Sequence, residues 1–380
     1  MMNGAGAGTA SFTAGGVKRV AVRSWRPRGL PWSRLPDRYS TLFYRSDLAE
    51  IVAQGQYDLV HLHNPLPALE MERVARACVA RGIPYVVSTH GFNEVANGSR
   101  IYGFDRIRRL VWERLVVGPV SRVARQASGI FALSPADVSI VRSMGFRGEP
   151  DIVCNGVPLP SSPAPGVDAE ALRRLGIPVE RRPGQITCMF LANHTPNKGL
   201  PQLLEAIGRL RRPCLLIVGG ERRAAIDYER YLRACKPGQE IIVTGRVGDD
   251  DVAAMFRRSD LFVFPTLADT FPLVVLEAMS HGLPVLATRV GGIPYQVDDG
   301  CGALVEPDDP AQLAEAIDRL ATYPALLSQL GENARARVTA EFVWERAAER
   351  AMDGYRRVLG LEAAGSPSLR QRAVERAHAG

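Results

Sequence analysis

Short apolar runs alternate with longer amphipathic segments along this chain, and the alternation occurs in both halves. In the first half, residues 58–65 (DLVHLHNP) and 86–91 (VVSTHG) are strand-like runs that end in polar residues. In the second half, 215–220 and 241–247 are similar runs, and a helical pattern at 249–257 follows. Strands that alternate with helices predict doubly wound α/β domains with parallel sheets. Such sheets bind ligands at the carboxyl ends of their strands.

A proline-rich segment divides the two series of strands and helices. Residues 158–165 read PLPSSPAP, which favours a linker. We therefore expect a first domain at 17–157, a linker at 158–166 and a second domain at 167–340. A chain of 380 residues with 46% hydrophobic residues has enough material for two cores. Helical patterns continue to the end of the second domain, at 310–322, 324–339 and 343–359.

Both ends of the chain are poor in core-forming residues. Residues 1–16 (MMNGAGAGTASFTAGG) have low complexity, and we expect them to be disordered. We also expect a disordered tail at 361–380. Val17 to Ser24 is then the first plausible strand.

The segment 265–292 (PTLADTFPLVVLEAMSHGLPVLATRVGG) contains two carboxylates, Asp269 and Glu277, on either side of a predicted helix start. Pro272 suits the first helical position, where no N–H is needed, and the helix continues over 273–279. A helix N-terminus presents free N–H groups and partial positive charge, which favours a phosphate group. The plainer interpretation is a core helix without a ligand.

A lysine lies at a second predicted helix start. In 190–199 (FLANHTPNKG), an apolar run is followed by a polar turn, and Lys198 precedes a helix with apolar positions at helical spacing. The plainer interpretation of Lys198 is a solvated surface residue.

These segments resemble the donor-site motifs of the retaining glycosyltransferases of family 4, which have the GT-B fold. The resemblance implies two facing Rossmann-like domains, with a nucleotide-sugar in the cleft between them and a last helix, here 341–360, packed back on the first domain. It implies that Glu277 holds the ribose, Asp269 a hydroxyl of the donor sugar and Lys198 the diphosphate. Further donor contacts are implied for Asn193, Arg246, Thr270, Phe271, Leu273 and Val274, with Arg246 contacting the base.

The resemblance also assigns residues in the first half. His90 matches the family histidine that faces the donor sugar, and we place His63 and Asn64 in the acceptor cleft. Lone histidines are more often structural. His61 and His63 have a spacing that could chelate a metal, but no third ligand is apparent, so we expect no metal site.

The chain departs from the family pattern at several points. Asp269 stands for a glutamate, Pro272 for a glycine, and Asn193 for an arginine beside the diphosphate. Val17 to Ser24 matches the family's second strand, so the first strand and its glycine-rich loop are absent or unrecognisable. An inactive or truncated nucleotide-sugar-binding protein therefore remains an alternative.

Charge is concentrated in the first half. Residues 1–157 hold 20 Lys and Arg against 12 Asp and Glu, whereas the remainder holds 27 against 28. Seven arginines between 100 and 125 accompany an apolar stripe of Ile107, Leu110, Val111, Leu115 and Val116. This segment is either a helix that contacts an anionic membrane or acceptor, or a core-facing helix with a solvated basic face, which we favour. No recognition motif supports nucleic-acid binding.

The cysteines and the hydropathy suggest a location. Six cysteines stand singly, which favours reduced thiols over a disulfide framework. No apolar run approaches eighteen residues, and no secretory signal precedes Val17. We expect a cytoplasmic protein, with peripheral membrane contact as an option.

The function expected from these features is glycosyl transfer. A hexose-type sugar would move from a UDP- or GDP-sugar to a hydroxyl of a glycan, lipid or small-molecule acceptor, without a metal or other cofactor. A nucleotide-sugar epimerase of the same fold is the second alternative.

Overall fold

The computed structural model describes residues 10–14, 16–25, 43–64, 66–101 and 103–361. Most of the predicted disordered N-terminus and all but the first residue of the predicted tail lie outside these ranges. The chain divides into two compact units. Unit 1 comprises residues 1–132, 138–153 and 349–380, and unit 2 comprises 133–137 and 154–348.

Unit 1 is built on a four-stranded parallel sheet in the order β5-β6-β7-β8. The strands are β5 Val60–Leu62, β6 Tyr85–Ser88, β7 Gly129–Ala132 and β8 Asp151–Ile152. The helices are α2 Leu48–Gln54, α3 Ala68–Arg81, α4 Phe92–Ile101, α5 Arg106–Trp112, the π-helical η3 Glu113–Val117, α6 Gly118–Gln126 and α7 Ala136–Ser143. Strands β6 and β7 are buried at every position, as parallel strands covered on both faces should be.

The N-terminal strand prediction is wrong in part. Strand β1 Ala10–Ala14 pairs antiparallel with β2 Val17–Ala21, so part of the predicted disordered segment is a strand. This hairpin lies outside the parallel sheet, and Val17 and Val20 are exposed. The charged residues between these valines fit an exposed ribbon rather than a buried parallel strand. A second short pair joins β3 Ser24–Trp25 to β4 Arg45–Ser46.

Unit 2 is built on a six-stranded parallel sheet in the order β11-β10-β9-β12-β13-β14. The strands are β9 Ile186–Leu191, β10 Cys214–Gly219, β11 Gln239–Gly245, β12 Leu261–Phe264, β13 Val285–Thr288 and β14 Gly302–Val305. The helices are α8 Val167–Arg174, the 3₁₀-helical η4 Pro196–Lys198, α9 Leu200–Arg209, α10 Tyr228–Arg233, α11 Asp249–Arg258, α12 Leu273–Ser280, α13 Ile293–Gln296, α14 Pro310–Ala321 and α15 Pro324–Glu341.

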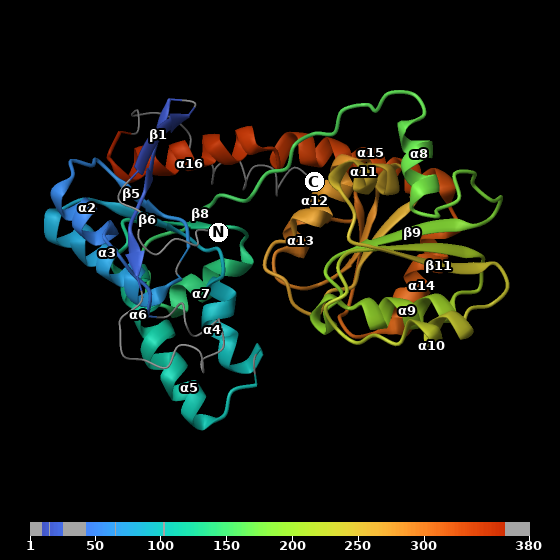
Figure 1. The fold of residues 1–380 in the computed structure, drawn as a ribbon, viewed down its shortest axis with the longest axis horizontal. Helices are drawn as coiled ribbons and strands as arrows, with labels where there is room; N and C mark the ends of the chain where they lie inside the picture. The colour runs from blue at the N-terminus through green and yellow to red at the C-terminus, as the bar shows by residue number, and fades with distance from the viewer. Residues whose placement is uncertain (1–9, 15, 26–42, 65, 102, 362–380) are drawn as a thin grey trace. The chain divides into compact units, whose positions relative to one another are not determined.

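The layers of unit 2 follow from the crossovers between its parallel strands. Helices α9, α10 and α14 cover one face of the sheet, and α8, α11 and α12 cover the other (Figure 1). The central strands are apolar and fully buried because both faces are covered. The sheet order is that of a Rossmann fold, with β9 as the first strand.

The boundary between the units differs from the predicted one. Residues 154–166 belong to unit 2, where Val157 N donates to Phe342 O at 2.8 Å and the backbone of Gly156 packs against Trp344. The last helix, α16 Trp344–Val358, belongs to unit 1 from residue 349 onwards. There, Gly354 packs against Phe131 of β7, and Arg357 forms an ion pair with Asp151.

Candidate functional site

The candidate donor site lies at the carboxyl edge of the unit 2 sheet. Strands β9 and β12 are neighbours, but the helices that follow them, α9 and α12, lie on opposite faces. The strand order therefore reverses between β9 and β12, and ligands of open α/β sheets bind at such a switch point. The loop after β9 carries Lys198, and the loop after β12 carries Asp269.

The structure brings these two predicted residues into contact. Lys198 Nζ lies 2.6 Å from Asp269 Oδ2, although the residues are 71 positions apart. Their side chains are 25% and 16% exposed, so the pair is largely buried but still accessible to a ligand. The other carboxylate oxygen accepts a hydrogen bond from Thr270 N at 2.9 Å. A phosphate that binds Lys198 would therefore share its ammonium with Asp269.

The backbone around Lys198 is held against the end of β12. Thr266 Oγ1 and Leu267 N both donate to Asn197 O, at 3.0 and 2.8 Å. Gly199 has φ +73°, and a Cβ at this position would lie 1.8 Å from Pro265 O. The glycine therefore permits both the left-handed conformation and the close approach of the two loops.

We expect Gly199→Ala to destabilise the protein by at least about 3 kcal/mol, because it adds a backbone clash to the strain of positive φ. Gly184 has the same φ of +73° but no atom within 4 Å of its Cβ position. Gly184→Ala should therefore cost only about 1–2 kcal/mol. Urea unfolding of both variants measures the difference. Equal losses would show that the two loops separate without cost.

The N-terminus of α12 corrects one sequence prediction. Pro272 is not the first helical residue but the N-cap, because its ψ of 117° is extended. Its carbonyl accepts from Val275 N at 3.3 Å and from Gln296 Nε2 at 3.1 Å. Leu273 and Val274 follow as the first helical residues, and N–H groups at these positions have no intrahelical partner. They are the predicted backbone donors.

Two glycines support the loop that precedes α12. A Cβ on Gly291 would lie 2.0 Å from Asp269 O, and one on Gly292 would lie 2.7 Å from Thr270 O. Gly292 N donates to Thr270 O at 2.8 Å. The side chain of Phe271 is 6% exposed and packs against Phe342, so this predicted donor-site residue can offer a ligand its backbone only.

Glu277 lies one turn into α12 and is half-buried. Burial raises the pKa of its carboxyl group, and the carboxylate of Asp249 adds to the effect. Glu277 has no hydrogen-bond partner for its side chain within the residues that the structure describes. An unpaired, half-buried carboxylate is suited to accept hydrogen bonds from a ligand hydroxyl.

The remaining predicted donor residues are exposed. Asn193 follows β9, and Arg246 follows β11 directly, so both lie at the carboxyl edge. Sequence reasoning missed Arg222, which follows β10 and forms an isolated parallel bridge with His194, the residue after Asn193. The Arg222 guanidinium lies 4.8 Å from the Tyr228 ring centroid. The backbone of Arg222 thus lies beside the Asn193-His194 segment, where the family arginine is missing. Its place just after the Gly219-Gly220 turn is the sequence signal that could have indicated it.

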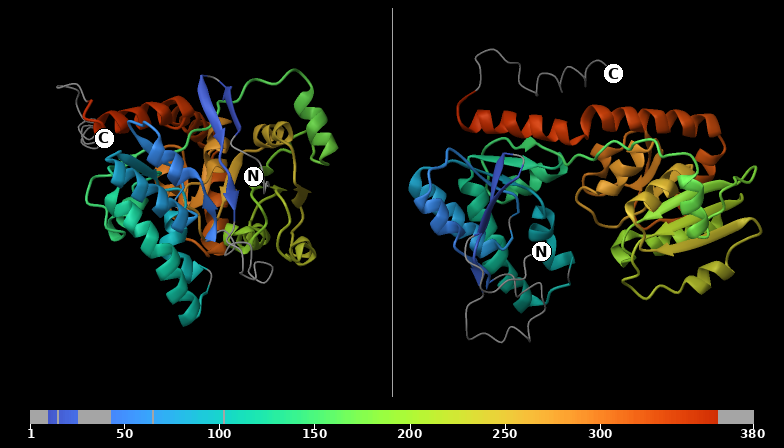
Figure 2. Two further views of the ribbon diagram at one scale, coloured as in Figure 1. Left: turned by 60° about the vertical axis from the view of Figure 1, so that its left-hand side comes forward. Right: turned by 45° about the horizontal axis from the view of Figure 1, so that its top comes forward.

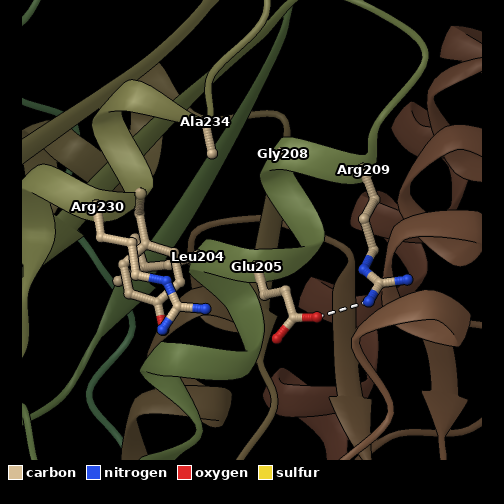
Figure 3. Close-up of a pocket in the computed structure, with 7 residues that line it drawn as sticks. Leu204, Glu205, Gly208, Arg209, Arg230 and Ala234 are labelled. Carbon is tan, nitrogen blue, oxygen red and sulfur yellow. Dashed lines mark hydrogen bonds and ion pairs between the residues drawn. The ribbon is translucent and has the colours of Figure 1, made fainter.

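A shallow pocket elsewhere in unit 2 lies between α9 and α10 (Figure 3). Glu205 in this pocket is already paired with Arg209 at 2.6 Å. None of the predicted donor-site residues lines the pocket, which lies along the later part of α9 rather than at its start. We therefore assign no ligand to it.

Unit 1 gathers histidines at the carboxyl ends of β5 and β6. His61 is hydrogen-bonded at both ring nitrogens. Its Nδ1 lies 2.6 Å from Tyr355 Oη, and its Nε2 lies 2.8 Å from Ser88 Oγ. Burial, together with the nearby rings of His63 and His90, lowers the pKa of His61 to about 4. Because both ring nitrogens are hydrogen-bonded within unit 1, His61 offers neither of them to a metal ion or a ligand.

Two of the predicted residues of this unit, His63 and His90, lie close to His61. The rings of His63 and His61 stack with centroids 3.8 Å apart, and His63 is exposed. Burial lowers the pKa of His90, followed by the effect of His63. Asn64 Oδ1 accepts from Leu66 N at 3.0 Å. Tyr355, which sequence reasoning missed, lies 294 positions from His61, and no local pattern indicates it.

The described residues include neither a candidate metal cluster nor a helix that could span a membrane. Within them, no group of three or more His, Cys, Asp and Glu side chains is arranged to hold a metal ion. No helix in the described part of the chain is long and apolar enough to cross a bilayer. All six cysteines are free.

Two family models match the two halves of the chain. The model described as Glycosyltransferase Family 4 matches residues 10–160, and that described as Glycosyl transferases group 1 matches residues 185–322. The second match includes Lys198, Asp269 and Glu277.

Similar proteins of known name are glycosyltransferases. The chain is 32% identical over 318 residues to the D-inositol 3-phosphate glycosyltransferase of Streptomyces avermitilis, across 79% of this chain and 65% of that protein. Its identity to the enzyme of that name from Mycobacterium tuberculosis is 30% over 325 residues, across 80% of this chain and 63% of that protein. The chain thus spans just under two thirds of the length of these relatives.

Solved structures with this fold are also glycosyltransferases or related synthases. Sucrose-phosphate synthase from Thermosynechococcus elongatus is 20% identical, with a TM-score of 0.66 across 93% of this chain and 86% of that one. Anabaena HepE in complex with UDP is 19% identical, with a TM-score of 0.63 across 80% of each chain. These similarities concern the fold. Together with the two matched family models, they show that the chain belongs to the family 4 glycosyltransferases and has the GT-B fold.

Proposed function

We propose that this protein transfers a hexose-type sugar from a UDP- or GDP-sugar to an acceptor hydroxyl, with retention of the anomeric configuration. The observation that carries the proposal is the contact between Lys198 and Asp269 at the switch point of the unit 2 sheet. A partly buried ion pair at this edge, next to a helix N-terminus, provides a cation for the diphosphate and a carboxylate for a sugar hydroxyl.

Each part of the donor has a residue of suitable chemistry. Glu277 would accept hydrogen bonds from the ribose, and Arg246 would contact the base. Lys198 and the N–H groups of Leu273 and Val274 would bind the diphosphate. Asp269 would orient a hydroxyl of the sugar. The known relatives support a nucleotide donor, since HepE was solved with UDP and with UDP-glucose.

The chemistry would depend on stabilising the leaving diphosphate. As the sugar–phosphate bond breaks, negative charge grows on the phosphate oxygens, where Lys198 and the α12 N-terminus would stabilise it. Lys198 and this helix end supply positive charge, so we propose that transfer needs no metal. The acceptor hydroxyl would attack on the face from which the diphosphate leaves. We assign no separate nucleophile.

The acceptor is a glycan, a lipid-linked group or a small molecule, and we propose that unit 1 contributes His90, His63 and Asn64 to the sugar and acceptor. Related enzymes are named for inositol 3-phosphate and sucrose phosphate, which are anionic. The basic first half fits an acceptor of that charge. We propose a cytoplasmic location, consistent with six free cysteines, and peripheral contact with anionic membranes through the basic first half.

Two alternatives with the same fold predict different products. An epimerase would convert the donor without an acceptor and would release no nucleoside diphosphate. An inactive binding protein would hold the donor unchanged. The presence of Lys198, Asp269 and Glu277 favours the transferase over an inactive protein, because we assign each of them to the leaving group or the donor sugar.

Isothermal titration with UDP, GDP and ADP, and with a common sugar of each, tests the proposal. We expect one base series to bind at micromolar concentrations in the presence of EDTA. Chromatography of the bound donor after incubation with and without candidate acceptors then distinguishes transfer, epimerisation and inert binding. If no nucleotide bound, the donor site would be wrong.

A further inference from the structure

We propose that helix α5 and the π-helical segment η3 after it form the element through which this protein docks on an anionic lipid surface. The inference deepens the peripheral contact proposed above by assigning it to particular residues. Figures 1 and 2 show α5 projecting from the rest of unit 1. Its tip is therefore available to a surface.

The exposed side of α5 is apolar. Ile107, Leu110 and Val111 are 77%, 64% and 43% exposed. Their spacing of three and four places them on one helix face. The expectation that this stripe faces a core is therefore wrong for these three residues, although Val116 of the same stripe is buried. Single exposed apolar residues are ordinary on protein surfaces, but three adjacent large ones on a projecting helix form a patch.

Helix α5 is held to the unit 1 core through its last residue, Trp112, and not through the exposed apolar residues. Trp112 is 7% exposed, and its Nε1 donates to Val95 O at 2.9 Å. Val116 and Val120 continue the buried side. Burial begins at Trp112 because the preceding turns of α5 extend beyond the unit 1 core. The patch is thus not needed to hold the helix in place.

Arginines surround the apolar patch. Arg108 pairs with Asp105 at 3.4 Å and Arg109 with Glu113 at 2.9 Å, both as exposed ion pairs. Within the residues that the structure describes, Arg106 and Arg114 have no ion-pair partner. Two cations beside an apolar face complement an interface of acyl chains and anionic headgroups. A protein partner of neutral surface would leave these charges without a counterpart.

A groove continues the patch toward the body of unit 1. It has a volume of about 740 Å³, and its lining includes Leu110, Arg114, Leu115 and Arg122. Two carboxylates also line the groove, and both are paired. Glu72 Oε1 lies 2.6 Å from Arg122 Nε, and Glu113 pairs with Arg109. The groove therefore has apolar and cationic sides without an unpaired acid. This combination fits a lipid headgroup next to the inserted helix.

Sedimentation of the full chain with vesicles tests the inference. We expect binding to phosphatidylcholine vesicles that contain phosphatidylglycerol, weaker binding at high salt, and little binding to phosphatidylcholine alone. The double variant Ile107→Ser with Leu110→Ser should bind the anionic vesicles at least about tenfold more weakly. Arg106→Ala with Arg114→Ala should lose about tenfold or more at low salt and less at high salt.

A matched control uses exposed apolar residues of unit 2. Tyr323 and Leu326 are 59% and 44% exposed, so Tyr323→Ser with Leu326→Ser removes comparable apolar surface elsewhere and should leave vesicle binding unchanged. An unchanged melting temperature shows that the variants are folded. The inference is overturned if the chain binds neutral vesicles as well as anionic ones, or if the Ile107 and Leu110 variant binds anionic vesicles as tightly as the parent does. It is also overturned if light scattering without lipid shows that the parent is a dimer and this variant a monomer, because the patch would then be a dimer interface. Nucleotide titration of the same variants keeps a failure of docking separate from a failure of the proposed function.

Discussion

Replacing Lys198 with alanine should slow release of nucleoside diphosphate from the donor by about 10² to 10³. The lysine is held where the leaving phosphate would gain charge, while in the free site its ammonium is already paired with Asp269 at 2.6 Å. Its attraction to a ground-state diphosphate is therefore partly offset, and it should matter most as the bond breaks. Steady-state kinetics with the donor identified by titration measures kcat, and calorimetry measures the nucleotide Kd.

Two controls distinguish a catalytic cation from a merely structural ion pair. Arg223→Ala removes the cation of another ion pair at the same sheet edge, that with Glu221 at 2.7 Å, and should leave kcat within about twofold. Asp269→Asn leaves Lys198 in place but removes its carboxylate partner. If Lys198→Ala and Asp269→Asn changed only the unfolding free energy and left turnover intact, the pair would serve folding alone.

Replacing Glu277 with glutamine should weaken nucleotide binding by about 10- to 100-fold, the loss typical of a hydrogen bond to a charged group. The glutamine keeps the size of the side chain and one acceptor, so packing of α12 should be unchanged. Titration with the preferred nucleoside diphosphate measures the effect. Glu205→Gln, on the exposed face of α9, serves as the matched control. Equal affinity of the Glu277 variant and the parent would remove Glu277 from the ribose site.

Glu277→Gln should also stabilise the folded protein at neutral pH but not in acid. The folded-state pKa of Glu277 is raised above its ordinary value of 4.5, chiefly by burial. Ionisation therefore costs more in the folded than in the unfolded chain, and stability declines as pH rises through the raised pKa. Glu277→Gln should raise the melting temperature at pH 7, and the gain should vanish below about pH 4.5. A gain that persisted in acid would arise from packing rather than from charge.

Local sequence patterns were sufficient to predict the elements that carry the donor site. The helix at α12 and the turn before α9 were predictable because proline, glycine and apolar spacing act within a few residues. The cap position of Pro272 was not, since its extended ψ is supported by the carbonyl contact with Gln296, which lies 24 positions away. Where a helix or strand begins depends on such distant contacts more than whether the segment is a helix or a strand.

The apolar stripe at 107–116 shows the limit of periodicity. A repeat of three and four residues indicates that a helix has an apolar face, but it does not indicate what that face meets. The structure divides the stripe, with Val116 buried and Ile107 exposed, because the core of unit 1 ends at Trp112. The extent of a core is a property of the whole unit and has no local signal.

By itself, the sequence determined the α/β class, the alternation of strands and helices, and the identity of the chemically capable residues, because these depend on short-range spacing and side-chain chemistry. Only the tertiary structure decided which of these residues meet. It paired Lys198 with Asp269 across 71 positions, placed Arg222 beside His194, and engaged both nitrogens of His61 through Tyr355. These contacts arise from strand order and helix docking, which bring together residues that are distant along the chain.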